Sequence, residues 1–169
     1  MHAASRILAL VIFCLGLSAC FTSEEPLIGA EDAVFPFERI VFAEVSRSDD
    51  QQSWTRKGDA YSWQPDESNE QEAVMRLKAV GDDLYLVQME FTERDRPERL
   101  YALLKADLPA KRVTAYASIM PDAFAAQPGL SICDKAVCID DVDAYVAYAK
   151  GRIDAGFPPD AEYEIIEMK

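Results

Sequence analysis

The feature that most constrains the fold is an alternation of apolar and polar residues between Val34 and Ile119. Successive side chains of a β-strand point to opposite faces, so a period of two is typical of strands with one buried face. Gly, Asp and Pro residues separate the alternating runs, as they do between antiparallel strands. The pattern predicts consecutive strands near Ile40–Val45, Ser53–Lys57, Ala60–Gln64, Ala73–Val80, Leu84–Phe91, Arg99–Lys105 and Arg112–Ser118.

The first hairpin can be aligned residue by residue if Gly58-Asp59 forms a two-residue turn, because glycine readily supplies the positive φ that such a turn needs. This alignment gives three cross-strand pairs: Lys57 with Ala60, Arg56 with Tyr61, and Trp54 with Trp63. Four large side chains then share one face: Trp54, Arg56, Tyr61 and Trp63. We favour core packing for this face. The alternative is a binding face, since Trp, Tyr and Arg are enriched where proteins recognise partners.

The second hairpin is aligned by the face that its apolar residues share. A three-residue loop, Gly81-Asp82-Asp83, pairs Leu77 with Val87 and Met75 with Met89. Seven residues then share one side: Met75, Leu77, Ala79, Tyr85, Val87, Met89 and Phe91. A two-residue turn would break this side, because a slip of one residue turns every side chain of a strand to the opposite face. The other face is expected to be solvated and carries Arg76, Lys78, Gln88 and Glu90.

The C-terminal part changes from the strand period to the helical period. The residues at helical spacing are Val142, Tyr145, Val146, Ala149 and Ile153. Asp140 or Asp141 can cap the helix, and Gly156 followed by Pro158-Pro159 ends it. A last strand at Glu162–Glu167 can close the sheet. The predicted fold is therefore α+β and mainly β: an antiparallel meander of six to seven strands, forming a half-barrel or barrel, with one C-terminal helix.

The N-terminal segment has the order of a secretory signal: Arg6, a short apolar run from Ile7 to Ala19, and small residues at its end. The run is too short for a membrane span, which needs about 20 residues. The sequence Leu17-Ser18-Ala19-Cys20 resembles the lipobox of bacterial lipoproteins. The resemblance implies removal of residues 1–19 and lipidation of Cys20. We expect residues 20–33 to be a lipidated tether and residues 34–169 to be a single globular domain.

The same resemblance predicts where the protein is located. In enteric bacteria, an Asp directly after the lipidated cysteine retains a lipoprotein at the inner membrane, and this chain has Phe21 there. The expected location is therefore the bacterial cell envelope, with the periplasmic face of the outer membrane favoured over the inner membrane.

The expected location assigns a role to each of the four cysteines. Cys14 leaves with the signal and Cys20 is lipidated, which leaves Cys133 and Cys138 in an oxidising compartment. These two are expected to form a structural disulfide at the start of the helix. A redox pair usually has two intervening residues, and a zinc site would need two further soft ligands.

Charge and composition exclude several classes of function. The chain has 17 Lys and Arg against 30 Asp and Glu, a net charge of −13, which argues against nucleic-acid binding. The only histidine is His2, inside the signal, so Ser-His-Asp catalysis, Cys-His catalysis and histidine metal sites are excluded from the mature chain. No glycine-rich phosphate loop and no calcium-loop pattern is present. We expect a protein that is not an enzyme and has neither cofactor nor metal.

Two functional hypotheses follow. The first is a non-catalytic, lipid-anchored envelope protein that acts as a binding or accessory module through the Trp54/Arg56/Tyr61/Trp63 face. Its acidic charge would suit a basic envelope protein as partner. The second is a carrier of a small apolar ligand or lipid, held in a β-barrel interior lined by Met75, Leu77, Val87, Met89 and Phe91. A filled core and a ligand cavity use the same residues, so both hypotheses stand. An enzyme that uses carboxylates is third.

Overall fold

The computed structural model describes residues 21–63, 72–93, 96–117, 127–133 and 136–169. In this part of the chain one helix follows ten strands and an eleventh strand follows the helix. The elements are β1 (Phe21–Thr22), β2 (Arg39–Glu44), β3 (Arg47–Lys57), β4 (Ala60–Trp63), β5 (Ala73–Gly81), β6 (Leu84–Glu93), β7 (Arg96–Asp107), β8 (Arg112–Tyr116), β9 (Leu130–Cys133), β10 (Ala136–Ile139), α3 (Val142–Asp154) and β11 (Ala161–Met168).

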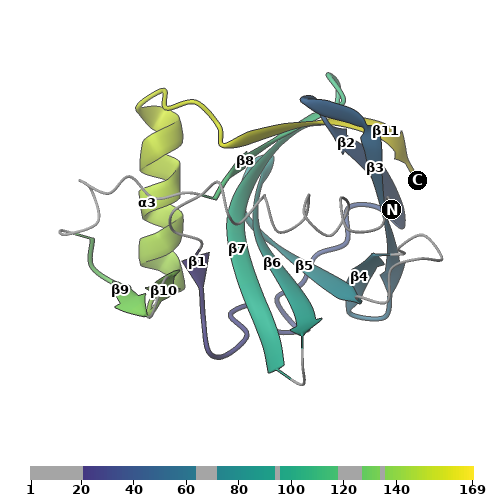
Figure 1. The fold of residues 1–169 in the computed structure, drawn as a ribbon. Coiled ribbons are helices and arrows are strands. Elements are labelled where there is room, and N and C mark those ends of the chain that lie inside the picture. Colours follow the sequence, from purple (N-terminus) through teal and green to yellow (C-terminus); the bar gives the residue numbers. More distant parts are fainter. Residues whose placement is uncertain (1–20, 64–71, 94–95, 118–126, 134–135) are drawn as a thin grey trace, which may run out of the picture.

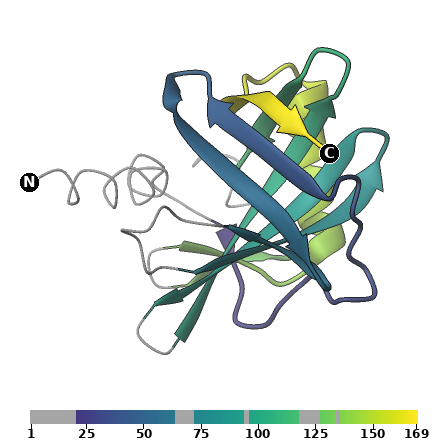
Figure 2. The same cartoon turned by 90° about the vertical axis from the view of Figure 1, so that its right-hand side faces the viewer.

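Eight of the strands form a closed antiparallel barrel. Their order is β6-β5-β4-β3-β2-β11-β8-β7, and β7 pairs back with β6 to close the ring. Figure 1 looks along the barrel axis and Figure 2 shows the barrel from the side. The predicted mainly β barrel with one C-terminal helix is therefore confirmed. All seven predicted strands are present, and the terminal strand, as β11 between β2 and β8, makes eight rather than six to seven.

The predicted alignment of both hairpins is also confirmed. In the first, the pairs between β3 and β4 include Trp54 with Trp63, Arg56 with Tyr61 and Lys57 with Ala60. In the second, the pairs between β5 and β6 include Met75 with Met89 and Leu77 with Val87. Gly58 has a φ of 65°, the left-handed value for which glycine was expected at that turn.

The tip of the second hairpin differs from the predicted three-residue loop. Gly81 pairs with Leu84, and the register shifts between Ala79 and Gly81. The turn itself is therefore Asp82-Asp83, with Asp83 at a φ of 57°. The bulge adds one residue to β5, which takes the place of the third loop residue. The register that the apolar face requires is therefore kept with a two-residue turn.

Apolar clusters lie on both sides of the barrel wall. The interior cluster fills the barrel, and its buried members are Ile40, Trp54, Tyr61, Ala73, Met75, Leu77, Val87, Phe91, Leu100 and Ile165. The outer cluster lies between the wall and α3, and its buried members are Phe21, Ile28, Leu86, Tyr101, Val137, Ile139, Tyr145 and Val146. Figure 1 shows α3 standing beside β7 and β1, outside the ring of barrel strands.

Helix α3 begins where one of the two predicted caps places it. The side chain of Asp141 accepts hydrogen bonds from the backbone nitrogens of Asp143 and Ala144. Gly156, with a φ of 75°, follows the last turn. The buried face of the helix contains Tyr145, Val146 and Ala149, as the spacing predicts, and also Arg152. Arg152 pairs at 3.3 Å with Asp160, a buried ion pair that the helical spacing does not indicate.

Part of the segment 21–33, which was expected to be a tether, packs against the barrel wall. Phe21 is 1% exposed and Ile28 is fully buried. Phe21 pairs with Tyr101 of β7 and, in parallel, with Val137 of β10. The physical reason is that Phe21 and Ile28 are large apolar residues in a short segment that looks polar on average, and the outer cluster buries both.

The expectation of a solvated outer face on the second hairpin is wrong for Gln88, which is 1% exposed. Alternation predicts correctly that this side chain leaves the barrel interior. It does not predict that a second layer, made of α3 and the N-terminal segment, covers the outside of β6 and β7. The short strands β9 and β10, which are not among the predicted strands, form a hairpin attached to β1.

Candidate functional site: the barrel interior

The four residues of the candidate binding face lie on the inner wall of the barrel. Trp54 is 3% exposed and Tyr61 is fully buried, and both belong to the interior cluster. Trp63 is half-buried and packs against that cluster, while Arg56 is exposed at its edge. The four residues therefore share a face, as predicted, but three of them point into the barrel and do not form an open platform.

The residues proposed to line a ligand site occupy the same interior. Met75, Leu77, Val87 and Phe91 are buried members of the interior cluster, and Met89 packs against it. The two candidate sets from the sequence are thus parts of one structural feature.

One end of the barrel is closed by residues 34–37, which we call the plug. The backbone nitrogen of Val34 donates to the carbonyl oxygen of Leu77 at 2.8 Å. The rings of Phe35 and Phe37 lie 5.6 Å and 4.7 Å from the ring of Tyr61, measured between centroids. In Figure 2 the segment before β2 passes around the right-hand end of the barrel, where the Gly58-Asp59 turn also lies.

The charge at the plug is neutralised locally. The guanidinium carbon of Arg56 lies 4.1 Å from the centroid of the Phe35 ring, and Nη1 is 3.1 Å from Oε1 of Glu38. The hydroxyl of Tyr61 donates to the carbonyl oxygen of Phe37 at 2.7 Å. Burial raises the pKa of Tyr61 to about 12, so this hydroxyl remains a neutral donor at physiological pH.

The interior cluster contains a buried polar atom without a partner. Nε1 of Trp54 is inaccessible to solvent and makes no hydrogen bond to the described part of the chain. Its cross-strand neighbours are Ile40 and Trp63, neither of which has an acceptor group in its side chain. Leaving a buried donor unpaired costs about 1–3 kcal/mol. The indole N–H is therefore a point where an oxygen from outside the chain would gain a hydrogen bond.

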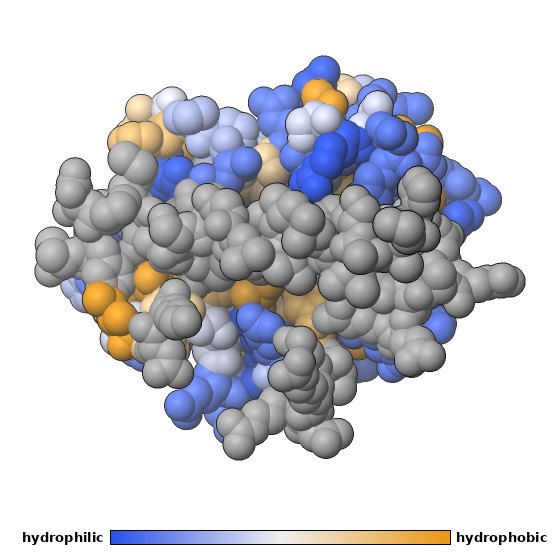
Figure 3. Space-filling model, viewed as in Figure 1, coloured by the Kyte–Doolittle hydropathy of each residue, from blue (hydrophilic) through white to orange (hydrophobic). Residues whose placement is uncertain are grey.

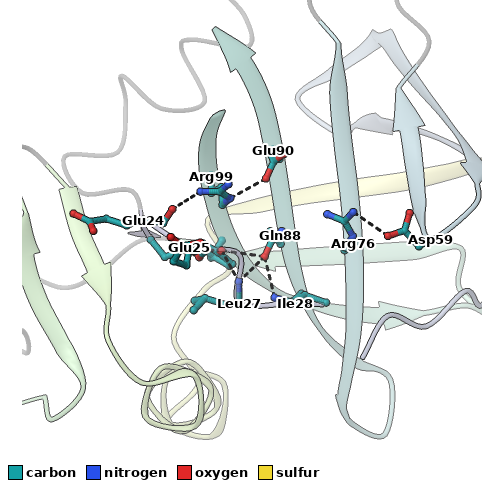
Figure 4. Close-up of polar contacts among 11 residues, drawn as sticks. Glu24, Glu25, Leu27, Ile28, Asp59, Arg76, Gln88, Glu90 and Arg99 are labelled. Carbon is teal, nitrogen blue, oxygen red and sulfur yellow. Dashed lines mark hydrogen bonds and ion pairs between the residues drawn. The ribbon is translucent and has the colours of Figure 1, made fainter. Parts of the chain in front are cut away.

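A second polar site lies on the outer wall (Figure 4). Oε1 of Gln88 accepts hydrogen bonds from the backbone nitrogens of Leu27 at 2.9 Å and Ile28 at 3.0 Å, and from the hydroxyl of Tyr101 at 3.0 Å. The Tyr101 hydroxyl lies 2.8 Å from Oγ of Ser23 and accepts from the Leu27 nitrogen at 3.2 Å. These bonds fasten the N-terminal segment to β6 and β7.

Arg99 also connects the N-terminal segment to the barrel wall. Its Nε lies 2.8 Å from Oε2 of Glu90, and its Nη1 donates to the backbone carbonyl of Glu24. Sequence reasoning missed this outer site. Gln88 and Tyr101 stand at outward-facing positions beside Leu86 and Leu103, and apolar residues on an outward face are the signal that could have indicated a covering layer.

The predicted disulfide is confirmed. Cys133 and Cys138 are bonded, with their Cα atoms 5.7 Å apart, across the β9–β10 hairpin. Thr22 of β1 pairs with Cys138, so the disulfide hairpin is attached directly to the N-terminal strand.

Other predicted features fall outside the described residues or concern absences. Cys20 and the segment 1–19 lie outside them. Within the described ranges, no helix has the length and apolar character to cross a membrane. In the same ranges, no three or more His, Cys, Asp or Glu side chains are grouped so that they could hold a metal ion.

Comparison with known proteins gives no match among family models, curated proteins or solved structures. The class is therefore defined by the fold and the site: a small, closed antiparallel β-barrel with an apolar, aromatic interior and a helix packed outside. This architecture is compatible with a ligand-binding module.

Proposed function

We propose that this protein is a non-catalytic, lipid-anchored envelope protein whose barrel interior binds one small apolar ligand that carries a hydrogen-bond acceptor. The observation that carries the proposal is the unpaired indole N–H of Trp54 inside an otherwise apolar cluster. Eight-stranded barrels have interiors just wide enough to be filled by side chains or to hold one small ligand.

The charges around the interior favour a neutral acceptor. Arg56, at the edge of the interior, is engaged by Glu38 and the Phe35 ring. The buried members of the interior cluster are all uncharged. A carboxylate among them would be desolvated without a counter-charge, which is strongly unfavourable. We therefore propose a ligand with an ester, ketone or amide carbonyl attached to an apolar body.

Ligand entry requires interior side chains to move, since Trp54 is 3% exposed. Met75 and Met89 face each other across β5 and β6 and belong to or pack against the same cluster. Methionine is unbranched and flexible, so these two side chains are suited to rearrange around a guest. The plug occupies one end, so we propose entry from the other end.

A direct test compares the apolar molecules that co-purify with three forms of the envelope-extracted protein. Native mass spectrometry and analysis of organic extracts should find a bound molecule in the wild type. Trp54→Phe removes the donor but keeps an aromatic ring, and it should weaken binding about 3–10-fold, the equivalent of about 0.5–1.5 kcal/mol.

Trp63→Phe is the matched control, because it makes the same change on the opposite residue of the same strand pair, where the indole nitrogen is not a buried unpaired donor. Its occupancy should stay close to that of the wild type. A protein that carries no apolar molecule and binds none when exposed to an envelope lipid extract would contradict the proposal. Equal losses in both variants would contradict the role of Trp54.

The anchor is tested separately. The support for it is the short apolar run that ends at Ala19-Cys20. Cells fed a clickable fatty acid should label the wild-type protein and not Cys20→Ser. Equal labelling of the two proteins would exclude the lipid anchor and leave the barrel proposal unaffected.

A further inference from the structure

We propose that the outer wall of the barrel binds one small monovalent anion, such as chloride or formate, between the side chains of Arg76 and Gln88. The two residues are direct cross-strand partners on β5 and β6. This site lies outside the barrel interior, so it depends neither on the apolar ligand nor on the lipid anchor.

Two buried N–H donors at this position have no acceptor in the described part of the chain. Nε of Arg76 and Nε2 of Gln88 are both inaccessible to solvent and make no hydrogen bond there. Cross-strand partners have Cβ atoms about 4.5–5.5 Å apart, and each of the two nitrogens is the third atom beyond its Cβ. A single acceptor about 2.9 Å from each nitrogen can therefore bridge the two donors.

The orientation of the Gln88 amide is fixed by its partners. The amide oxygen accepts hydrogen bonds from the backbone nitrogens of Leu27 and Ile28, which can only donate. A flipped amide would place its NH2 group against these two donors. Nε2 is therefore held in place as an unpaired donor, and Figure 4 shows Gln88 between the N-terminal segment and Arg76.

The engaged acceptors around the site favour an anion over a water molecule. A bound water must place its own hydrogens on acceptors. The Gln88 oxygen already accepts from three donors. The Asp59 carboxylate is paired with Arg76. The Glu90 carboxylate is paired with Arg99. An anion only accepts hydrogen bonds, so it satisfies both nitrogens without a further partner.

The two ion pairs beside the site keep their positive ends nearer the wall. The Arg76 side chain is 21% exposed and that of its partner Asp59 is 53% exposed. The Arg99 side chain is 11% exposed and that of its partner Glu90 is 27% exposed. Water therefore screens the carboxylates more strongly than the guanidinium groups, which favours an anion at the buried position.

The net charge of −13 does not oppose this arrangement. Figure 3 shows mainly hydrophilic residues at its upper right, over β2, β3 and β11, so the charges on that part of the surface are solvated. The Debye length is about 8 Å at physiological ionic strength, so solvated charges farther away than this have little effect at the site.

The cover over the site limits the anion to a small one with a single charge. Gln88 is 1% exposed, and Ile28, whose backbone nitrogen donates to it, is fully buried. Arg76 is already paired with Asp59, so the site offers at most one positive charge. A divalent anion would stay uncompensated in a buried position, which is strongly unfavourable.

The experiment measures the folding equilibrium constant by urea unfolding in sodium chloride, sodium formate or sodium gluconate, each at the same ionic strength of about 0.2 M so that charge screening is equal. Gluconate is too large for the covered site and serves as the reference salt. Chloride, formate or both should raise the equilibrium constant of the wild type at least about threefold over gluconate, because a ligand that binds only the folded state favours folding. An effect of only one of the two anions supports the site and identifies which ion fits it.

Two variants each remove one of the donors. Gln88→Glu keeps the oxygen that accepts from the N-terminal segment but loses the Nε2 donor, and Arg76→Gln loses the Nε donor and the charge. In both variants the ratio of the equilibrium constants in chloride and gluconate should fall to about one, as expected when no ligand binds. Lys78→Gln is the matched control, since it removes a positive charge from the outward face of the same strand, where no buried donor is left unpaired. Its ratio should equal that of the wild type.

Equal equilibrium constants of the wild type in all three salts would overturn the proposal and leave water as the acceptor. An anion effect that persists in both donor variants, or that Lys78→Gln also abolishes, would overturn the assignment to Arg76 and Gln88. If a donor variant does not fold, a crystal of the wild type grown in sodium bromide decides the question. Anomalous scattering from bromide between the two side chains would support the site, and its absence there would contradict it.

Discussion

The side-chain oxygen of Gln88 lies 2.9 Å from the backbone nitrogen of Leu27, a residue 61 positions earlier in the chain. This bond joins the N-terminal segment to the outside of the barrel. The same oxygen also accepts from Ile28 and Tyr101, so one amide serves three donors. Gln88 is therefore one of the contacts that hold the N-terminal segment against the barrel wall.

Replacing Gln88 with leucine should lower the free energy of unfolding by about 2–4 kcal/mol, because it leaves buried donors without an acceptor. Lys78→Leu is the control, since Lys78 faces outward from the same hairpin and pairs with Asp32 at the surface. That change should cost no more than about 1 kcal/mol. Urea unfolding followed by circular dichroism measures both, and equal costs would contradict the role given to Gln88.

Of the two adjacent aspartates before α3, only Asp141 caps the helix. Asp141→Ala should destabilise the protein by about 1 kcal/mol, because the Asp141 side chain accepts from the first backbone nitrogens of the helix. Asp140→Ala is the neighbouring control and should change stability by less than about 0.5 kcal/mol. Thermal unfolding of both variants checks this, and the reverse order of effects would show that Asp140 is the cap.

The stability of the protein at alkaline pH should depend on Tyr61, which lies at the end of the barrel that the plug occupies. Burial raises the pKa of Tyr61 from 10.0 to about 12, so above pH 10 the unfolded chain loses this proton before the folded chain does. The contribution of Tyr61 is therefore complete below pH 10 and is lost as the pH rises towards 12.

The Tyr61→Phe variant lacks this titrating group. Its free energy of unfolding should therefore fall less steeply between pH 10 and 12 than that of the wild type. Urea unfolding at several pH values in this range gives both slopes. Other tyrosines also have a raised pKa, including Tyr101, so a smaller slope is expected to remain in the variant. Identical slopes in the two proteins would contradict the burial of this hydroxyl.

Alternation of apolar residues was enough to predict the barrel wall. The pairs Trp54–Trp63 and Leu77–Val87 follow from keeping large side chains on one face, because a slip of one residue reverses that face. The inner wall, and with it the candidate ligand site, was accessible from the sequence for the same reason. The alternation itself does not distinguish an inward face from an exposed one, so the Trp54 face had two interpretations.

The outer layer could not be predicted in this way. Phe21 and Gln88 are buried by segments far away in the sequence. The apolar residue Leu86 on the outward face beside Gln88 indicates that this face is covered, but not which segment covers it. The buried pair of Arg152 and Asp160 is similar, since a charged residue on a helix is usually exposed. The unpaired Trp54 nitrogen also depends on three-dimensional neighbours, which decide whether an indole finds an acceptor.

The central claim is that an oxygen of an apolar guest accepts a hydrogen bond from the indole N–H of Trp54. Nitrogen-15 labelling gives one indole resonance for each of the two tryptophans, and Trp54→Phe and Trp63→Phe assign them. We predict that adding an apolar carbonyl compound recovered from the envelope extract to the delipidated protein shifts the Trp54 resonance downfield and slows its hydrogen exchange, while the Trp63 resonance changes much less. A bound guest that leaves the Trp54 resonance unmoved would contradict the claim.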